Sequence, residues 1–137
     1  MKFELDHIGV AVRSLQQATG LYKALGWAAI PVESVSSEKV KVAFVEMENQ
    51  AAVELLEPTS EDSVIAKFLS KRGEGIHHIC LRVQDLDAAL VRLKAAGVRL
   101  IDEKPRPGAK NCRVAFIHPS SCNGVLVELS EPRKEGI

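Results

Sequence analysis

Two histidines and two glutamates stand at matching places in the two halves of this chain. His7 and His78 each precede an isoleucine and are 71 residues apart, while Glu54 and Glu128 each stand between valine and leucine and are 74 residues apart. Two neutral imidazoles with two carboxylates offer the mixed nitrogen and oxygen donors that suit a divalent ion such as Co, Zn, Mn or Ni. The four side chains are therefore candidate ligands of one Lewis-acidic metal ion.

The recurrence of these residues separates this interpretation from a purely structural one. A lone histidine in an apolar strand is more often a hydrogen-bonded core residue than a ligand. A glutamate buried without a partner is costly, however, and a cation is one natural partner for glutamates that recur between apolar residues. We therefore favour metal binding.

The four residues belong to a longer tandem repeat. Segments 5–30 and 76–101 align without a gap and are identical at nine positions, and segments 53–58 and 127–132 extend the repeat. Each copy supplies one histidine early and one glutamate late.

The first copy predicts a strand, a helix and three further strands. Residues 3–12 alternate as a strand, Ser14 and Gln17 form a capping-box signal for a helix that Gly26 ends, and strands follow at 28–34, 39–47 and 51–56. Residues 63–71 predict a short amphipathic helix between the copies.

The second copy repeats this pattern. We expect a strand at 76–83, a helix at 85–96 with Asp85 as N-cap and Gly97 as C-cap, and strands near 98–101, 112–117 and 124–129.

These elements predict an α+β fold of two tandem βαβββ modules, at residues 3–58 and 75–132, joined by a connector with a helix at 59–73 in one domain spanning 1–137. Each helix covers one face of its sheet and leaves the other bare, so we expect the two sheets to enclose a cleft. Pseudo-twofold pairing would bring His7, Glu54, His78 and Glu128 towards one axis, with the metal in that cleft.

Composition excludes several classes of protein. Basic and acidic residues number 18 each, so the zero net charge argues against a nucleic-acid surface. The three cysteines form no CxxC pair, no signal peptide is recognisable, and no apolar run approaches the roughly 20 residues of a membrane helix. We expect a cytoplasmic protein that binds neither nucleic acid nor membrane.

The paired His-Ile and Val-Glu-Leu motifs on repeated βαβββ units resemble the vicinal oxygen chelate superfamily, a glyoxalase-like fold that includes glyoxalase I and extradiol dioxygenases. Within it, several motifs in order are similar to the methylmalonyl-CoA epimerase family: residues 5–12 (LDHIGVAV), 54–58 (ELLEP), 61–63 (EDS), 73–79 (GEGIHHI), 116–119 (FIHP) and 124–129 (GVLVEL).

The resemblance implies metal ligands His7, His78 and Glu128, with Glu54 at a position that some members fill with glutamine. It also implies that the (2R) and (2S) forms of methylmalonyl-CoA are interconverted by removal of the C2 proton, with a metal stabilising the enolate charge. Glu128 is our candidate for one proton transfer. Glu54 ranks first for the other, with Lys41, Glu46 or a water as alternatives.

Further residues have weaker assignments. Four cations around the proline-rich loop of the second copy would contact the phosphates of coenzyme A, or are solubilising charges: Lys104, Arg106, Lys110 and Arg113. His118 is a candidate for binding substrate or a solvated loop residue. We expect Glu57 and Glu131 to be exposed charges, and the protein to form a homodimer.

Two other functions remain open. The first is a glyoxalase I-type lactoylglutathione lyase, which shares the metal and the enediolate chemistry, and the second is a metal-free small-molecule binding or resistance protein of the same fold. The donor set also leaves the native metal open, because it accepts several ions.

Overall fold

A computed structural model describes residues 2–132 of the chain. The chain divides into two compact units, which are His7–His77 and the combination of Met1–Asp6 with His78–Ile137. They are called the first-repeat unit and the second-repeat unit below. Strand β1 (Phe3–Ala11) and strand β5 (Gly75–Val83) each have residues in both units.

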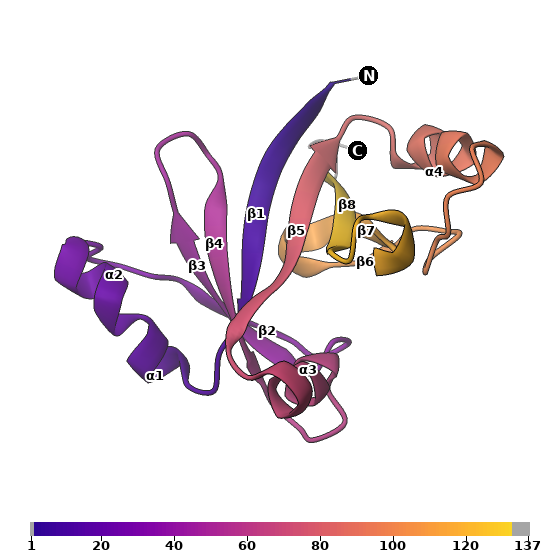
Figure 1. Ribbon diagram of the computed structural model, residues 1–137. Coiled ribbons are helices and arrows are strands. Elements are labelled where there is room, and N and C mark those ends of the chain that lie inside the picture. The colour runs from indigo at the N-terminus through magenta and orange to yellow at the C-terminus, as the bar shows by residue number, and fades with distance from the viewer. Residues whose placement is uncertain (1, 133–137) are drawn as a thin grey trace. The chain divides into compact units, whose positions relative to one another are not determined.

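The sheet of the first-repeat unit has the order β2-β3-β4-β1 (Figure 1). Strands β2 (Val32–Val35), β3 (Val40–Glu46) and β4 (Ala52–Pro58) are antiparallel neighbours, and β4 runs parallel to β1. Helices α1 (Leu15–Ala18) and α2 (Gly20–Leu25) connect β1 to β2, and α3 (Val64–Arg72) follows β4.

The second-repeat unit repeats this arrangement with the order β5-β8-β7-β6. Strand β8 (Leu126–Pro132) runs parallel to β5 and antiparallel to β7 (Cys112–Ile117), and the short β6 (Arg106–Pro107) pairs with β7. Helix α4 (Leu86–Ala95) connects β5 to the loop before β6, and two 3-10 turns are at Ala109–Asn111 and Pro119–Ser121. The predicted α+β fold of repeated units is confirmed.

Each unit has its hydrophobic core between one sheet face and the helix that follows the first strand. In the first-repeat unit, Leu15 of α1 packs with Ala43, Val45 and Leu55. In the second, α4 packs with the odd-numbered residues of β5, β7 and β8: Val83, Ala115, Ile117 and Leu129. Because side chains alternate along a strand, the even-numbered residues of these strands lie on the opposite face. We call that opposite face the site face of each unit.

The recurring glutamates at strand ends are part of the helix caps. Glu57 Oε1 accepts the backbone N–H of Leu15 at 3.0 Å, and Glu131 Oε1 accepts that of Leu86 at 3.4 Å. Both glutamates are half-buried, so the expectation of exposed charges was wrong. The reason is that each strand ends beside the first turn of its helix, whose N–H groups lack partners within the helix.

The predicted N-caps are confirmed, but α4 has Ala96 rather than the predicted Gly97 as its C-cap, and the first helix is broken. The Ser14 and Asp85 side chains accept the N–H groups of Gln17 and Ala88, as predicted. Thr19 separates α1 from α2, and its hydroxyl donates to the carbonyl of Leu15 at 2.8 Å. Thr19 is buried, and its hydroxyl finds its hydrogen-bond acceptor in the backbone of the preceding turn. This contact explains why the predicted continuous helix divides at Thr19.

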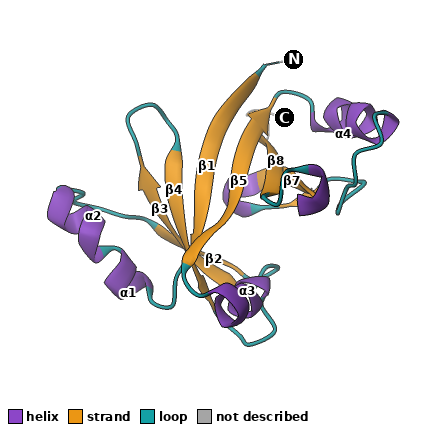
Figure 2. Cartoon of the chain, viewed as in Figure 1, coloured by secondary structure: helices purple, strands orange, loops and turns teal. Residues whose placement is uncertain are grey.

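Two predicted strands differ from the structure. The strand predicted at 28–34 begins only at Val32, after Pro31, whose nitrogen has no proton to donate to a sheet. The strand predicted near 98–101 is reduced to one bridge between Leu100 and Ile117. Most of residues 96–105 form loop, which Figure 2 shows between α4 and β6. No helix within residues 2–132 combines the length and the apolar character that crossing a bilayer requires.

Candidate metal centre

The first-repeat unit joins His7 to Glu54. Gly9 of β1 lies opposite Glu54 of β4 and His7 lies opposite Ala52, so His7 and Glu54 share the site face. The His7 Nδ1 atom is 2.9 Å from Glu54 Oε2, and both residues are buried. The predicted first pair of donors therefore lies in direct contact, away from α1 and α2.

The second-repeat unit contains the matching pair. Cys80 of β5 lies opposite Glu128 of β8, so His78 shares the site face with Glu128. His78 Nε2 is 3.2 Å from Glu128 Oε1, and both residues are buried. Residues 47 and 50 positions apart in sequence thus meet in two pairs of the same chemistry.

A phenylalanine accompanies each pair. Phe44 lies opposite Glu54 in one sheet, and Phe116 lies opposite Glu128 in the other. The Phe116 ring meets the His78 ring edge to face, with 6.2 Å between the ring centroids. The apolar rings lower the local polarity, which strengthens electrostatic interactions with the buried carboxylates.

The donors have the chemistry of a metal centre. His7, His78 and Glu128 are each buried, and their imidazoles and carboxylate are donors of the kinds that hold a metal ion. Glu54 contacts His7 Nδ1 within the first-repeat unit. A carboxylate in that position can fix the orientation and the tautomer of a ligating histidine, which leaves Nε2 as the donor atom.

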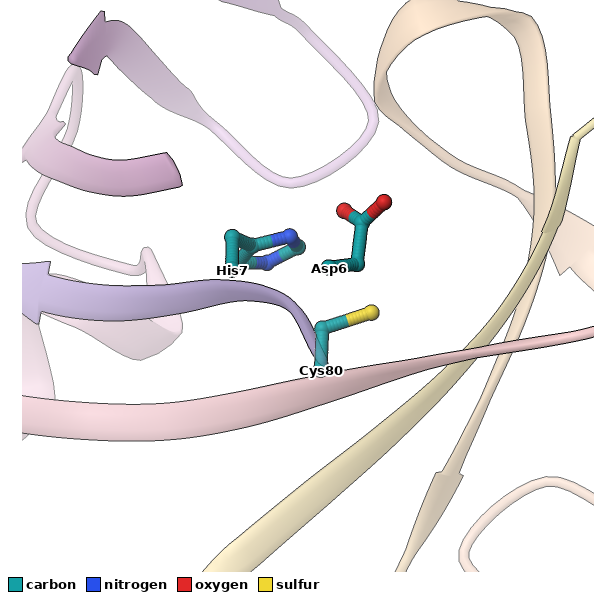
Figure 3. Close-up of side chains that lie close together, drawn as sticks. All are labelled: Asp6, His7 and Cys80. Atoms are coloured by element: carbon teal, nitrogen blue, oxygen red, sulfur yellow. The ribbon is translucent and has the colours of Figure 1, made fainter. Parts of the chain in front are cut away.

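The residues beside the pairs serve other purposes. Figure 3 shows the carboxylate of Asp6 beside the thiol of Cys80, together with His7, the next residue of β1. Asp6 Oδ1 accepts hydrogen bonds from Arg82 Nη2 at 2.7 Å and Nε at 3.0 Å. The hydrogen bonds to Asp6 raise the pKa of the Arg82 guanidinium above its usual value. Asp6 therefore anchors β1 to β5 within the second-repeat unit.

The four predicted phosphate-binding cations have different surroundings. Arg113 lies on the helix side of β7, where it binds Glu131 Oε2 at 2.8 Å and Asp87 Oδ2 at 3.0 Å. The hydrogen bonds that Arg113 donates to Asp87 raise the pKa of its guanidinium. Arg106 lies opposite Val114, and so on the site face. Lys104 and Lys110 are exposed on the loop.

His118 has a structural partner in the turn that follows β7. Its Nδ1 atom accepts the N–H of Ser120 at 3.0 Å and lies 2.8 Å from the Ser120 hydroxyl. The ring therefore caps the 3-10 turn Pro119–Ser121. His77, the neighbour of His78, meets the Phe68 ring edge to face instead, at 5.1 Å between ring centroids.

Sequence reasoning did not identify Phe116 or Asp102 as neighbours of this site. Asp102 Oδ2 accepts the N–H of Phe116 at 2.8 Å and lies 3.4 Å from Arg106 Nε. The repeat gave a weak signal for the phenylalanine, since Phe44 precedes its glutamate by 10 residues and Phe116 precedes its own by 12. No sequence signal existed for Asp102, whose partners are set by the path of a loop.

Sequence comparisons find relatives over nearly the whole chain. The uncharacterized protein YqjC of Bacillus subtilis (strain 168) is 45% identical over 130 residues, which cover 94% of this chain and 92% of that protein. The mitochondrial methylmalonyl-CoA epimerase of Dictyostelium discoideum is 44% identical over 131 residues, which cover 93% of this chain and 78% of the relative.

Solved structures agree with these relatives. Methylmalonyl-CoA epimerase from Mycobacterium tuberculosis matches with a TM-score of 0.89 at 43% identity, over 96% of this chain and 89% of that one. A methylmalonyl-CoA epimerase in complex with methylmalonyl-CoA and NH4+ matches with a TM-score of 0.86 at 35% identity, over 96% of both chains. The family description "Glyoxalase/Bleomycin resistance protein/Dioxygenase superfamily" matches residues 6–116. The chain therefore belongs to the glyoxalase/bleomycin resistance protein/dioxygenase superfamily.

Proposed function

We propose that this protein is a metal-dependent epimerase that interconverts the (2R) and (2S) forms of methylmalonyl-CoA. The observation that carries the proposal is the buried His-Glu pair on the site face of each unit, at 2.9 Å for His7 with Glu54 and 3.2 Å for His78 with Glu128. The methylmalonyl-CoA epimerases of Dictyostelium discoideum and Mycobacterium tuberculosis are 44% and 43% identical to this chain. Solved relatives were bound to methylmalonyl-CoA or to 2-nitronate-propionyl-CoA, which supports an acyl-CoA substrate.

In this proposal His7, His78 and Glu128 hold one divalent ion such as Co, Zn, Mn or Ni, and Glu54 either joins them or orients His7. The bound ion would supply a Lewis acid that stabilises negative charge on the thioester oxygen. The burial of both pairs keeps water from competing for the carboxylates, and the phenylalanine beside each pair contributes to that exclusion.

Inversion at C2 needs one group to remove the proton and another to return a proton on the opposite face. We assign one transfer to Glu128 and the other to Glu54, because both carboxylates lie on site faces. Strand alternation disfavours Lys41, whose side chain lies on the same face as Ala43 and Val45 and so towards α1. Glu46 lies opposite Ala52 on the site face and is the alternative to Glu54.

The test is to incubate the purified protein with methylmalonyl-CoA in D2O, with and without added Co, and to follow deuterium at C2 and the ratio of epimers. The same protein is offered the hemithioacetal of methylglyoxal and glutathione. We expect deuterium exchange at C2 and epimerisation of methylmalonyl-CoA, both of which a chelator abolishes. Turnover of the hemithioacetal alone would assign a lactoylglutathione lyase. Absence of both reactions and of metal would instead indicate a binding or resistance protein.

A further inference from the structure

Arg106 is the one cation of the proline-rich loop that the sheet register places on the site face. It lies opposite Val114, and Val114, Phe116 and Glu128 share that face by strand pairing and alternation. Arg113, by contrast, lies on the other face with Asp87 and Glu131. The register therefore separates two arginines that the sequence had grouped together.

The guanidinium of Arg106 is fixed beside the donor pair of the second-repeat unit. Its central carbon lies over the Phe116 ring, 5.0 Å from the centroid, and Phe116 in turn meets the His78 ring at 6.2 Å. A cation over an aromatic face is attracted by the ring, and arginine stacks there more readily than lysine. One phenylalanine thus touches both the guanidinium and a candidate metal ligand.

Asp102 and Gly108 hold the loop in this arrangement. Asp102 Oδ2 accepts the Phe116 N–H at 2.8 Å and lies 3.4 Å from Arg106 Nε, so one carboxylate positions both the ring and the cation. A Cβ on Gly108 would lie 2.6 Å from Val114 Cγ1, and the Gly108 N–H donates to the Cys112 carbonyl at 2.9 Å. The loop therefore packs directly on β7, and a side chain at position 108 would force Val114 to shift.

The position of Arg106 selects the part of the substrate that it can reach. Only the Phe116 ring separates the Arg106 guanidinium from His78. In coenzyme A, the pantetheine chain separates the phosphates from the thioester. A planar guanidinium donates two parallel hydrogen bonds to a carboxylate. The Arg106 side chain keeps 41% of its surface exposed, which leaves it accessible to a ligand.

We propose that Arg106 binds the free carboxylate of the acyl group and makes the site specific for dicarboxylic acyl thioesters. Asp102 is a positioning residue for Arg106, since it orients the guanidinium and the Phe116 ring. This assignment rests on the proposed function, because it takes an acyl-CoA as the substrate and places the acyl end at the His-Glu pairs.

The experiment compares the binding of malonyl-CoA with that of propionyl-CoA, which has the same thioester and nucleotide but no free carboxylate. Calorimetry is performed on the Co-loaded wild type, on R106Q and R106K, and on R92Q as a matched control. Arg92 is an exposed cation on α4, the helix of the same unit that covers the opposite sheet face. Circular dichroism confirms that each variant is folded.

We expect R106Q to weaken malonyl-CoA binding roughly tenfold to a hundredfold, as for the loss of a charge-assisted hydrogen bond, and to leave propionyl-CoA binding unchanged. R106K should retain part of the preference because it keeps the charge without the planar fork, and R92Q should bind as the wild type does. An equal loss for both ligands would assign Arg106 to the phosphates and overturn the proposal, as would an R106Q variant that binds like R92Q.

The same experiment separates this inference from the proposed function. If the wild type prefers malonyl-CoA through Arg106 but does not epimerise methylmalonyl-CoA, the carboxylate assignment stands and the reaction is wrong. If the wild type epimerises methylmalonyl-CoA and R106Q matches R92Q in binding and in KM, the reaction stands and the role of Arg106 is wrong.

Discussion

The recurring glutamates allow a paired mutational test of the site, since Glu128 and Glu131 lie three residues apart on β8 and have opposite roles. Glu128 faces His78 on the site face, and Glu131 caps α4 through the Leu86 N–H and binds Arg113 on the other face. We predict that E128A abolishes the stabilisation given by Co and that E131A preserves it. Each substitution removes one glutamate carboxylate from β8, so the two variants differ only in the face of the strand that loses the charge.

The expected sizes follow from the contacts. An ion present at about 100 times its Kd stabilises the folded state by about 2.7 kcal/mol. For a chain of this length, roughly 3–5 °C per kcal/mol makes this a rise in Tm of about 10 °C. Loss of a cap costs about 0.5–2 kcal/mol, so E131A should lower the Tm of the metal-free protein by about 2–10 °C.

Thermal unfolding followed by circular dichroism, with and without Co, measures both effects. The first repeat offers the same comparison in E54A and E57A, because Glu54 contacts His7 and Glu57 caps α1. We expect E57A to behave like E131A, and E54A to reduce the Co response. A full Co response in E128A, or loss of that response in a folded E131A, would contradict these two roles.

Three further predictions concern the remainder of the chain. The Asp62 pKa is lowered from 3.8 to about 2 by hydrogen bonds from Lys39 and Ser60, so this carboxylate stabilises the fold above pH 3.8 and loses that effect as the pH falls towards 2; D62N should flatten this part of an acid-unfolding curve, and an unchanged curve would contradict the pairing. Burial raises the pKa of the Cys112 and Cys122 thiols, so iodoacetamide should label the native protein at pH 8 more slowly than a free thiol, and equal rates would contradict it. G108A should cost about 1–3 kcal/mol in urea unfolding because its Cβ would meet Val114, whereas G124A, at a glycine with open space, should cost only the strain of its positive φ.

The repeat made much of the fold predictable. Apolar alternation located the strands that bury one face, and the predicted N-caps Ser14 and Asp85 each cap a helix in the structure. Where local signals compete, prediction failed. Thr19 divides the first helix because its hydroxyl bonds to the backbone, and a helical apolar pattern cannot report that contact.

The repeat also made the four candidate donors of the site predictable, but not the loop residues around them. Duplication singled out His7, Glu54, His78 and Glu128, and the structure pairs them within each unit. The loop cations could not be sorted from sequence, since a shift of one residue in register exchanges the two sheet faces. The pairing of β6 with β7 in the structure shows that Arg106 and Arg113 lie on opposite faces of the sheet.

Glu57 and Glu131 show the converse error. Their recurrence was visible, but a charge beside a proline suggested solvent exposure. The structure instead uses both carboxylates at helix N-termini, where backbone N–H groups need acceptors. Recurrence in a duplicated chain therefore indicates a shared contact of some kind, and the face of the strand decides whether that contact is structural or chemical.

In the proposed function, the two His-Glu pairs serve a single ion. A crystal structure of the Co-loaded protein, with anomalous scattering at the cobalt edge and the metal content measured on the same sample, tests it most directly. We predict one ion per chain, bound by His7, His78 and Glu128. Two ions per chain, one on each pair, or an ion bound elsewhere would contradict the account.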